Sequence, residues 1–175
     1  MLKRCLKLTL LLTVLGLLPA AAQAQERRFR ATLIGNEEVP ALSNVATGTF
    51  RMLIDFSDSS FDYELTFSGV SGTGATQSHI HFGQKSVNGG IMVFFCTNLG
   101  NGPPGTQACP ANGTVGGRIT AANVGTGAAA QGIAAGEFAE VLRGIRAGTV
   151  YVNVHSALFP GGEIRGQLVP EVKLP

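Results

Sequence analysis

The three histidines of this chain are the residues whose type and spacing point most directly to chemistry. His79 and His81 are separated by one residue, so on an extended strand their side chains leave the same face about 7 Å apart at the backbone. Two side chains can close that separation onto one metal ion. His155 ends a second segment of strand-like alternation, 150–155. If these strands bring their histidine faces together, three neutral imidazoles suit copper or zinc and leave one coordination position open.

The same histidines have a plainer interpretation as hydrogen-bonded structural residues. A single histidine on a strand is more often structural than a metal ligand. The metal-site hypothesis therefore depends on His155 lying beside the other two rings. A separation of more than about 8 Å would prevent one ion from joining all three.

Two charged residues near the C-terminus, Glu163 and Arg165, share one face of an expected strand because they lie two positions apart. In one interpretation Arg165 attracts an anion and has a catalytic role, while Glu163 orients a histidine ligand. The alternative is a surface ion pair, or a buried arginine bound to loop carbonyls. The neighbouring Glu37 and Glu38 point to opposite faces of an extended chain, so we expect one backbone cap and one solvated carboxylate rather than an acid–base pair.

The segments that must position these residues have the pattern of strands. Apolar and polar residues alternate over 49–56 and 61–67, with turn-forming residues 57–60 between them, which predicts a hairpin. Further strands are expected at 29–33, 77–82, 91–96, 115–120, 149–155 and 164–169.

Glycine-rich breaks separate nearly all of these segments, and no helices alternate with them. This pattern favours an all-β fold, an antiparallel Greek-key-like β-sandwich or barrel. One short helix is expected at 137–147, where apolar residues follow spacings of three, one and three and Gly148 provides the end. No boundary divides the chain, so residues 25–175 are expected to form a single domain.

The N-terminal segment, residues 1–24, has the pattern of a secretory signal peptide. Basic residues precede the short apolar run 8–18, and Ala22-Gln23-Ala24 forms a small-residue cleavage site. A retained membrane anchor is the alternative, but the run is short for spanning a bilayer. We therefore expect a secreted or periplasmic protein without a membrane span after cleavage.

Two cysteines remain in the expected mature chain, Cys96 and Cys109. Export to an oxidising compartment favours a disulfide between them. Metal-binding or redox thiols are the alternative, although the spacing is too wide for a CxxC motif.

The charge balance excludes some partners. Lys and Arg number 13 against 11 Asp and Glu, giving a net charge of +2, and no basic run is present. A nucleic-acid binder needs a concentrated basic face, so nucleic acid is not an expected partner. A metal ion is the first expected partner, with a small anion or an extracellular protein as further candidates.

Four runs, at 36–40, 79–83, 151–156 and 160–168, together resemble the CHRD domain, the module named after chordin. The resemblance covers residues 29–169. It implies an all-β extracellular module, found alone in bacterial exported proteins and repeated within chordin, without a settled activity. This chain lacks the cysteine-rich repeats that flank the domain in chordin, so growth-factor binding does not transfer to it.

A second, weaker similarity is to the copper half of the Cu/Zn superoxide dismutases. It rests on the run 79–83, on a later strand ending in His155, and on a Gly-rich turn before Arg165. It implies that His79, His81 and His155 hold copper and that Arg165 steers superoxide. No histidines remain for the bridging and zinc positions, so the similarity implies at most a copper-only site.

Three functions follow from these observations. The first is an exported binding module with a three-histidine copper or zinc site. The second is a copper-dependent, dismutase-like oxidoreductase, and the third is a purely structural or adhesive domain.

Overall fold

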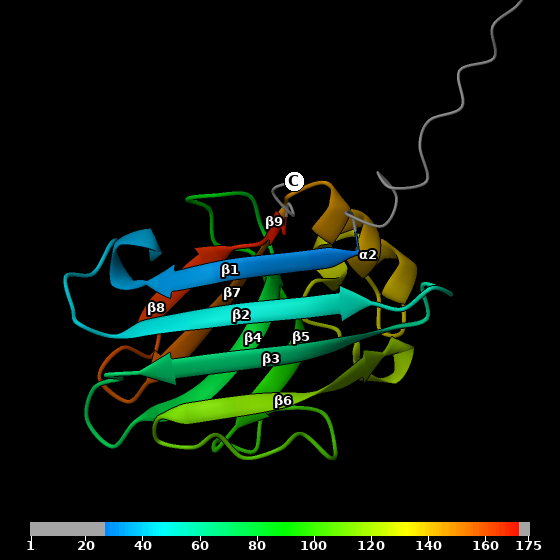
Figure 1. The fold of residues 1–175 in the computed structure, drawn as a ribbon. Helices are drawn as coiled ribbons and strands as arrows, with labels where there is room; N and C mark the ends of the chain where they lie inside the picture. Colours follow the sequence, from blue (N-terminus) through cyan, green and yellow to red (C-terminus); the bar gives the residue numbers. More distant parts are fainter. Residues whose placement is uncertain (1–26, 172–175) are drawn as a thin grey trace, which may run out of the picture.

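The computed structural model describes residues 27–171, which form one nine-stranded sheet (Figure 1). The predicted signal peptide lies outside the described residues. The strands are β1 (Arg28–Ile34), β2 (Thr47–Ile54), β3 (Ser60–Ser68), β4 (Ala75–Phe82), β5 (Gly90–Thr97), β6 (Gly113–Thr120), β7 (Val150–Ser156), β8 (Ile164–Gln167) and β9 (Val169–Pro170). Their order across the sheet is β5-β4-β7-β8-β1-β2-β3-β6, and β9 pairs with β1.

The sheet curls into a nearly closed barrel. In Figure 1, β1, β2, β3 and β6 form a front layer, while β4, β5, β7 and β8 cross behind it at an angle. The paired strands are antiparallel, and the pairs β3–β6 and β4–β7 join strands that are distant in sequence, as in a Greek key. Tyr63 on β3 donates a hydrogen bond to the Phe95 carbonyl on β5 at 3.3 Å, which links the two layers. The predicted all-β antiparallel fold is confirmed.

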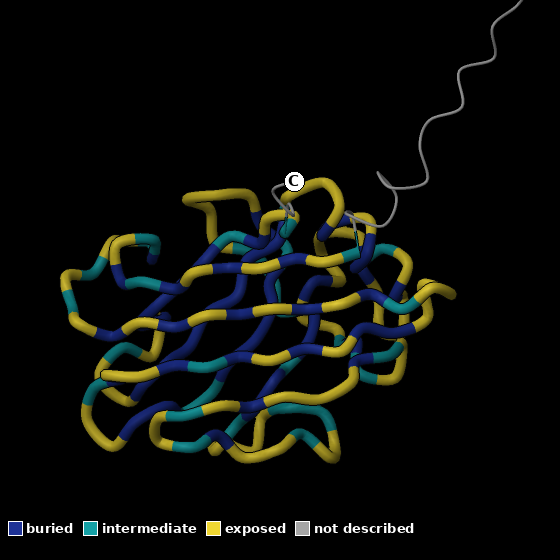
Figure 2. Tube along the Cα trace, viewed as in Figure 1, coloured by how far each residue is buried: buried dark blue, intermediate teal, exposed yellow. Residues whose placement is uncertain are grey.

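Alternating burial builds the core between the two layers. Along β2, buried and exposed residues alternate without exception, and β1 and most of β3 follow a similar alternation (Figure 2). Phe50 on β2 and Phe95 on β5 bring their ring centroids to 5.0 Å, and Tyr63 lies 4.4 Å from Phe95. The strand period visible in the sequence therefore becomes one apolar interior.

The predicted helix is α2 (Phe138–Arg146), and it packs Phe138 on Phe61 of β3 with ring centroids 5.8 Å apart. It ends before Gly148, whose φ of 72° is a conformation that glycine adopts without strain. Short 3-10 turns occur at Gly35–Glu37, Ala121–Asn123 and Ala129–Gln131. Among the residues described, no helix is long and apolar enough to cross a membrane.

The expected strand 164–169 is divided into β8 and β9. Leu168 lies between them, is buried, and donates its amide to the Val150 carbonyl at 2.9 Å. Beyond this point the chain pairs with β1 alone, through Val169 and Pro170. The C-terminal segment thus leaves β7 and stays beside β1 after the point where the Leu168 side chain packs into the core.

Strand β7 differs from the front strands because every one of its residues is buried. Val150, Val152 and Val154 belong to the core. The opposite face of β7 is covered by the β4–β5 loop (83–89) and the β7–β8 loop (157–163), whose backbones accept hydrogen bonds from it and from β4. Polar residues on this outer face therefore occupy a shielded layer between the sheet and two loops.

The predicted disulfide between Cys96 and Cys109 is present. We expect a Cys96→Ala, Cys109→Ala double variant to lose about 3 kcal/mol of unfolding free energy. The reason is that the disulfide joins residues 13 positions apart and so restricts the unfolded chain. Urea unfolding of the two proteins measures the difference. Reductant should destabilise the wild type by a similar amount and leave the double variant unchanged; a wild type insensitive to complete reduction would contradict the expectation.

Candidate metal centre

The three histidines converge on the outer face of the back layer. In the β4–β7 ladder His79 lies opposite Asn153, and Gln77 lies opposite His155, so His155 is the diagonal neighbour of His79. The ring centroids of His79 and His155 are 4.6 Å apart. Each histidine offers a ring nitrogen, and these nitrogens all lie within 4.8 Å of one another. The convergence that the sequence pattern predicted is therefore present.

The two covering loops orient two of the rings. The Nδ1 atom of His81 lies 2.8 Å from the Gly89 carbonyl, and the Nδ1 atom of His155 lies 2.9 Å from the Pro160 carbonyl. A carbonyl oxygen only accepts hydrogen bonds, so each Nδ1 carries the proton. The Nε2 atom of each ring consequently bears a lone pair. This is the arrangement in which a neutral histidine is held ready for a metal ion.

The third ring, His79, has an unusual set of neighbours. Its Nδ1 lies 2.9 Å from Nε2 of His81 and 3.2 Å from Oδ1 of Asn153. Its Nε2, like Nε2 of His155, is buried without a hydrogen-bond partner. Buried polar atoms are nearly always paired in folded proteins. The unpartnered Nε2 of His155 bears a lone pair and therefore fits a site for a cation.

Burial keeps the three rings neutral. Burial first, and then the neighbouring His155 and His81, lower the pKa of His79 to about 2. Burial likewise lowers the pKa of His81 to about 4, opposed by its hydrogen bond to Gly89. The pKa of His155 is also lowered, first by burial and then by Arg165. Neutral imidazole is the form that binds metals, so no net proton has to be released at neutral pH.

A stack of side chains packs against the cluster. The ring of Tyr151 lies parallel to the His81 ring, with centroids 4.7 Å apart and planes 3° from parallel. The Tyr151 hydroxyl accepts a hydrogen bond from the Gly89 amide at 3.2 Å. The guanidinium of Arg165 lies 4.0 Å from the Tyr151 ring centroid, a cation–π contact. This packing restricts the orientation of the His81 ring.

Arg165 is 3% exposed, and its charge is engaged within the protein. Its Nε donates to Glu38 at 3.0 Å, and its terminal nitrogens donate to the Val87 carbonyl and to the Asn88 side chain. This matches the alternative of a buried arginine bound to loop groups. A residue that steers anions must present its charge to solvent.

Glu163 is also buried, but its carboxylate faces Ser71. It accepts hydrogen bonds from the Ser71 amide at 3.0 Å and from the Ser71 hydroxyl at 2.6 Å. Among the described residues, no hydrogen bond joins Glu163 to an imidazole. The geometry therefore lends no support to the hypothesis that Glu163 orients a histidine ligand.

Two residues of this region were missed by the sequence argument. Glu38, expected as a backbone cap or a solvated group, is instead the buried partner of Arg165; the 127 positions between them leave no local signal. Burial raises the pKa of Glu38 to about 7 against the opposing effect of Arg165. Asn153 did carry a signal, because it shares the outward face of β7 with His155.

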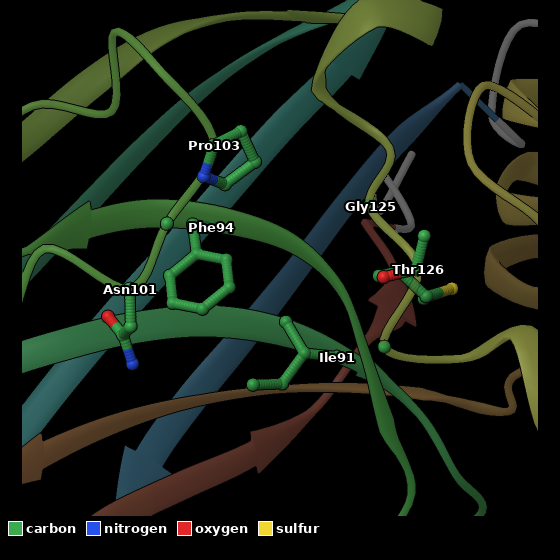
Figure 3. Close-up of a pocket in the computed structure, with 9 residues that line it drawn as sticks. Ile91, Phe94, Asn101, Pro103, Gly125 and Thr126 are labelled. Carbon is green, nitrogen blue, oxygen red and sulfur yellow. The ribbon is translucent and has the colours of Figure 1, made fainter.

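A surface cavity of about 330 Å³ lies against β5 (Figure 3). Phe94 on β5 forms part of its wall, beside Ile91 and Asn101. The same Phe94 ring meets His79 edge-on, with centroids 4.7 Å apart. One aromatic ring therefore lies between the cavity and the histidine cluster.

The fold and the site define a small antiparallel β domain with a buried three-histidine cluster. The sequence model of the CHRD domain family matches residues 29–168, so the chain belongs to that family. No curated protein matches the chain.

Proposed function

We propose that this chain is an exported CHRD-type binding module that holds one copper or zinc ion on His79, His81 and His155. The observation that carries the proposal is the convergence of three buried, neutral imidazoles, among which Nε2 of His155 has no hydrogen-bond partner in the described part of the chain. Imidazole nitrogen suits Cu(II) and Zn(II). The site is built on paired strands and covered by two loops, which favours a resident ion.

Export is part of this proposal and has separate support. The Cys96–Cys109 disulfide fits an oxidising environment. The expected signal peptide, residues 1–24, would direct the chain there. The CHRD family, whose domains are extracellular modules, agrees with the same compartment.

The test is a titration of metal-free, disulfide-bonded protein with Cu(II) and, separately, with Zn(II). We expect one ion per chain by calorimetry and by elemental analysis after gel filtration. At a free metal concentration of 100 times Kd, the ion should raise the unfolding free energy by about 2.7 kcal/mol. A His79→Ala, His81→Ala double variant should lose both the stoichiometric binding and the stabilisation.

An Asp62→Ala variant serves as the control for adventitious binding. Asp62 lies on the front layer, where its exposed carboxylate pairs with Arg118. This variant should bind the ion as the wild type does. A wild type that takes up no ion and gains no stability, or a double variant that binds as well as the wild type, would refute the metal site.

Superoxide chemistry is not the function proposed, because Arg165 is buried and paired with Glu38. An assay of superoxide removal by the copper-loaded protein would check this choice. We expect no activity above that of free copper. A rate that falls with salt and in an Arg165→Lys variant would instead favour the dismutase-like alternative.

A further inference from the structure

Asn153 lies at the centre of the histidine cluster. Its Oδ1 is 3.2 Å from Nδ1 of His79 and 3.1 Å from Nε2 of His81, and those two nitrogens are 2.9 Å apart. An ion bound at about 2.0–2.1 Å holds neighbouring ligand atoms roughly 2.9–3.4 Å apart. The three atoms therefore already have the mutual spacing of ligands on one ion.

These three atoms share a single proton. Nε2 of His81 has none, because the ring's proton is on Nδ1 and is donated to Gly89. Oδ1 of Asn153 has none, since an amide oxygen only accepts. The one proton is on Nδ1 of His79. No hydrogen atom is therefore available for a hydrogen bond between Oδ1 of Asn153 and Nε2 of His81, which are both acceptors. Two electron-rich atoms thus face each other at 3.1 Å in a buried site, a contact that a cation would relieve.

We propose that Asn153 is a fourth ligand of the metal ion, binding through Oδ1 beside Nδ1 of His79, Nε2 of His81 and Nε2 of His155. This inference rests on the proposed function. On binding, the proton of His79 leaves Nδ1 and is replaced by one on Nε2, so the ring stays neutral and no net proton is released. An N3O ligand set is one that Cu(II) adopts.

The test compares Asn153→Ala, which removes the oxygen, with Asn153→Asp, which keeps one. Cu(II) titration should show binding weakened by about 10–100-fold in Asn153→Ala and retained or strengthened in Asn153→Asp. The Cu(II) EPR spectrum should change in Asn153→Ala. Asn98→Ala is the matched control, because Asn98 bonds the Ala75 and Cys109 carbonyls away from the cluster. Its affinity and spectrum should equal those of the wild type.

A second measurement reports on the ligand atoms directly and does not need the alanine variant to fold. In the Zn(II)-loaded wild type, ¹⁵N NMR of the imidazoles should show His79 bound through Nδ1 and protonated at Nε2. Binding of His79 through Nε2, or an Asn153→Ala variant with unchanged affinity and EPR spectrum, would overturn the role of Asn153 while leaving the three-histidine site intact. A wild type that binds no metal would instead refute the proposed function.

Discussion

An Arg165→Met variant is expected to lose about 3–5 kcal/mol of unfolding free energy at neutral pH, because Glu38 would remain buried without its cationic partner. Both side chains of this pair are almost fully buried, and Nε of Arg165 lies 3.0 Å from Oε2 of Glu38. The second carboxylate oxygen has no hydrogen-bond partner among residues 27–171. Folding of the variant would therefore require Glu38 to be protonated or to stay charged in an apolar site. Urea unfolding measures the loss.

The pH dependence of this loss follows from the pKa of Glu38. Burial already raises that pKa above its ordinary value of 4.5, to about 7, while Arg165 lowers it. Without the arginine, the folded pKa should rise further, so the folded protein binds more protons than the unfolded chain and stability falls as pH rises. The destabilisation should thus be larger at pH 8.5 than at pH 6.

A Glu38→Leu, Arg165→Met double variant is the control. Replacing both members of a buried ion pair by apolar residues is often close to neutral. We expect this variant to be more stable than Arg165→Met alone and to lack its pH dependence. If the double variant is as unstable as the single one, lost packing rather than the uncompensated carboxylate would be the cause.

The metal-free protein is expected to lose several kcal/mol of stability between pH 6.5 and pH 4.5 through its histidine cluster. The imidazoles have an ordinary pKa of 6.5, and burial lowers it to about 4 for His81 and further for His79. In this window the unfolded chain binds protons that the folded protein cannot. Stability is therefore present above pH 6.5 and is lost as pH falls, by up to about 1.4 kcal/mol per pH unit for each ring.

Glu38 acts in the opposite direction over the same range, since its folded pKa is raised rather than lowered. The histidines should still decide the direction of the pH dependence, because the pKa values of three rings are lowered and the pKa of only this one carboxyl is raised in the same range. Urea unfolding with EDTA at pH 7, 6, 5 and 4.5 measures the slope. A His81→Asn variant should be less sensitive to acid than the wild type, and equal slopes for the two proteins would show that His81 does not contribute.

The Glu38–Arg165 pair and the histidine cluster, which cause these two losses of stability, belong to one continuous layer on the outer face of the back strands. Arg165 contacts Glu38 on one side and the Tyr151 ring on the other, and Tyr151 stacks on His81. The ion pair is therefore linked to the histidine cluster through the Tyr151 ring. Metal affinity measured in the Glu38→Leu, Arg165→Met variant would show how far that link matters.

Much of the fold was predictable because strand periodicity is a local property. Alternation over 49–56 and 61–67 is imposed by the geometry of an extended chain with one solvent-exposed face, and the two segments form the expected hairpin β2–β3. The first strand ends earlier than expected, at Ile54, and Phe56 lies exposed in the turn. The helix 138–146 follows for the same reason, from the spacing of its apolar residues. The disulfide was predictable because Cys96 and Cys109 are the two cysteines that remain once the expected signal peptide, which contains Cys5, is set aside.

Part of the candidate site was also local. His79 and His81 must share a face on any strand, and Asn153 must share one with His155, whatever the rest of the chain does. These shared faces follow from strand geometry alone and need no partner strand. They define two half-sites, His79 with His81 and Asn153 with His155, and each offers too few ligands to bind an ion firmly.

Only the tertiary structure brought the two half-sites together. The pairing of β4 with β7 joins segments more than 70 positions apart, and nothing in either segment specifies the other as its neighbour. The same holds for Glu38 and Arg165, and for the loop carbonyls that orient the rings. Pairings at this range are decided by how the whole chain buries its apolar faces, so they are properties of the folded protein and cannot be read from one segment at a time.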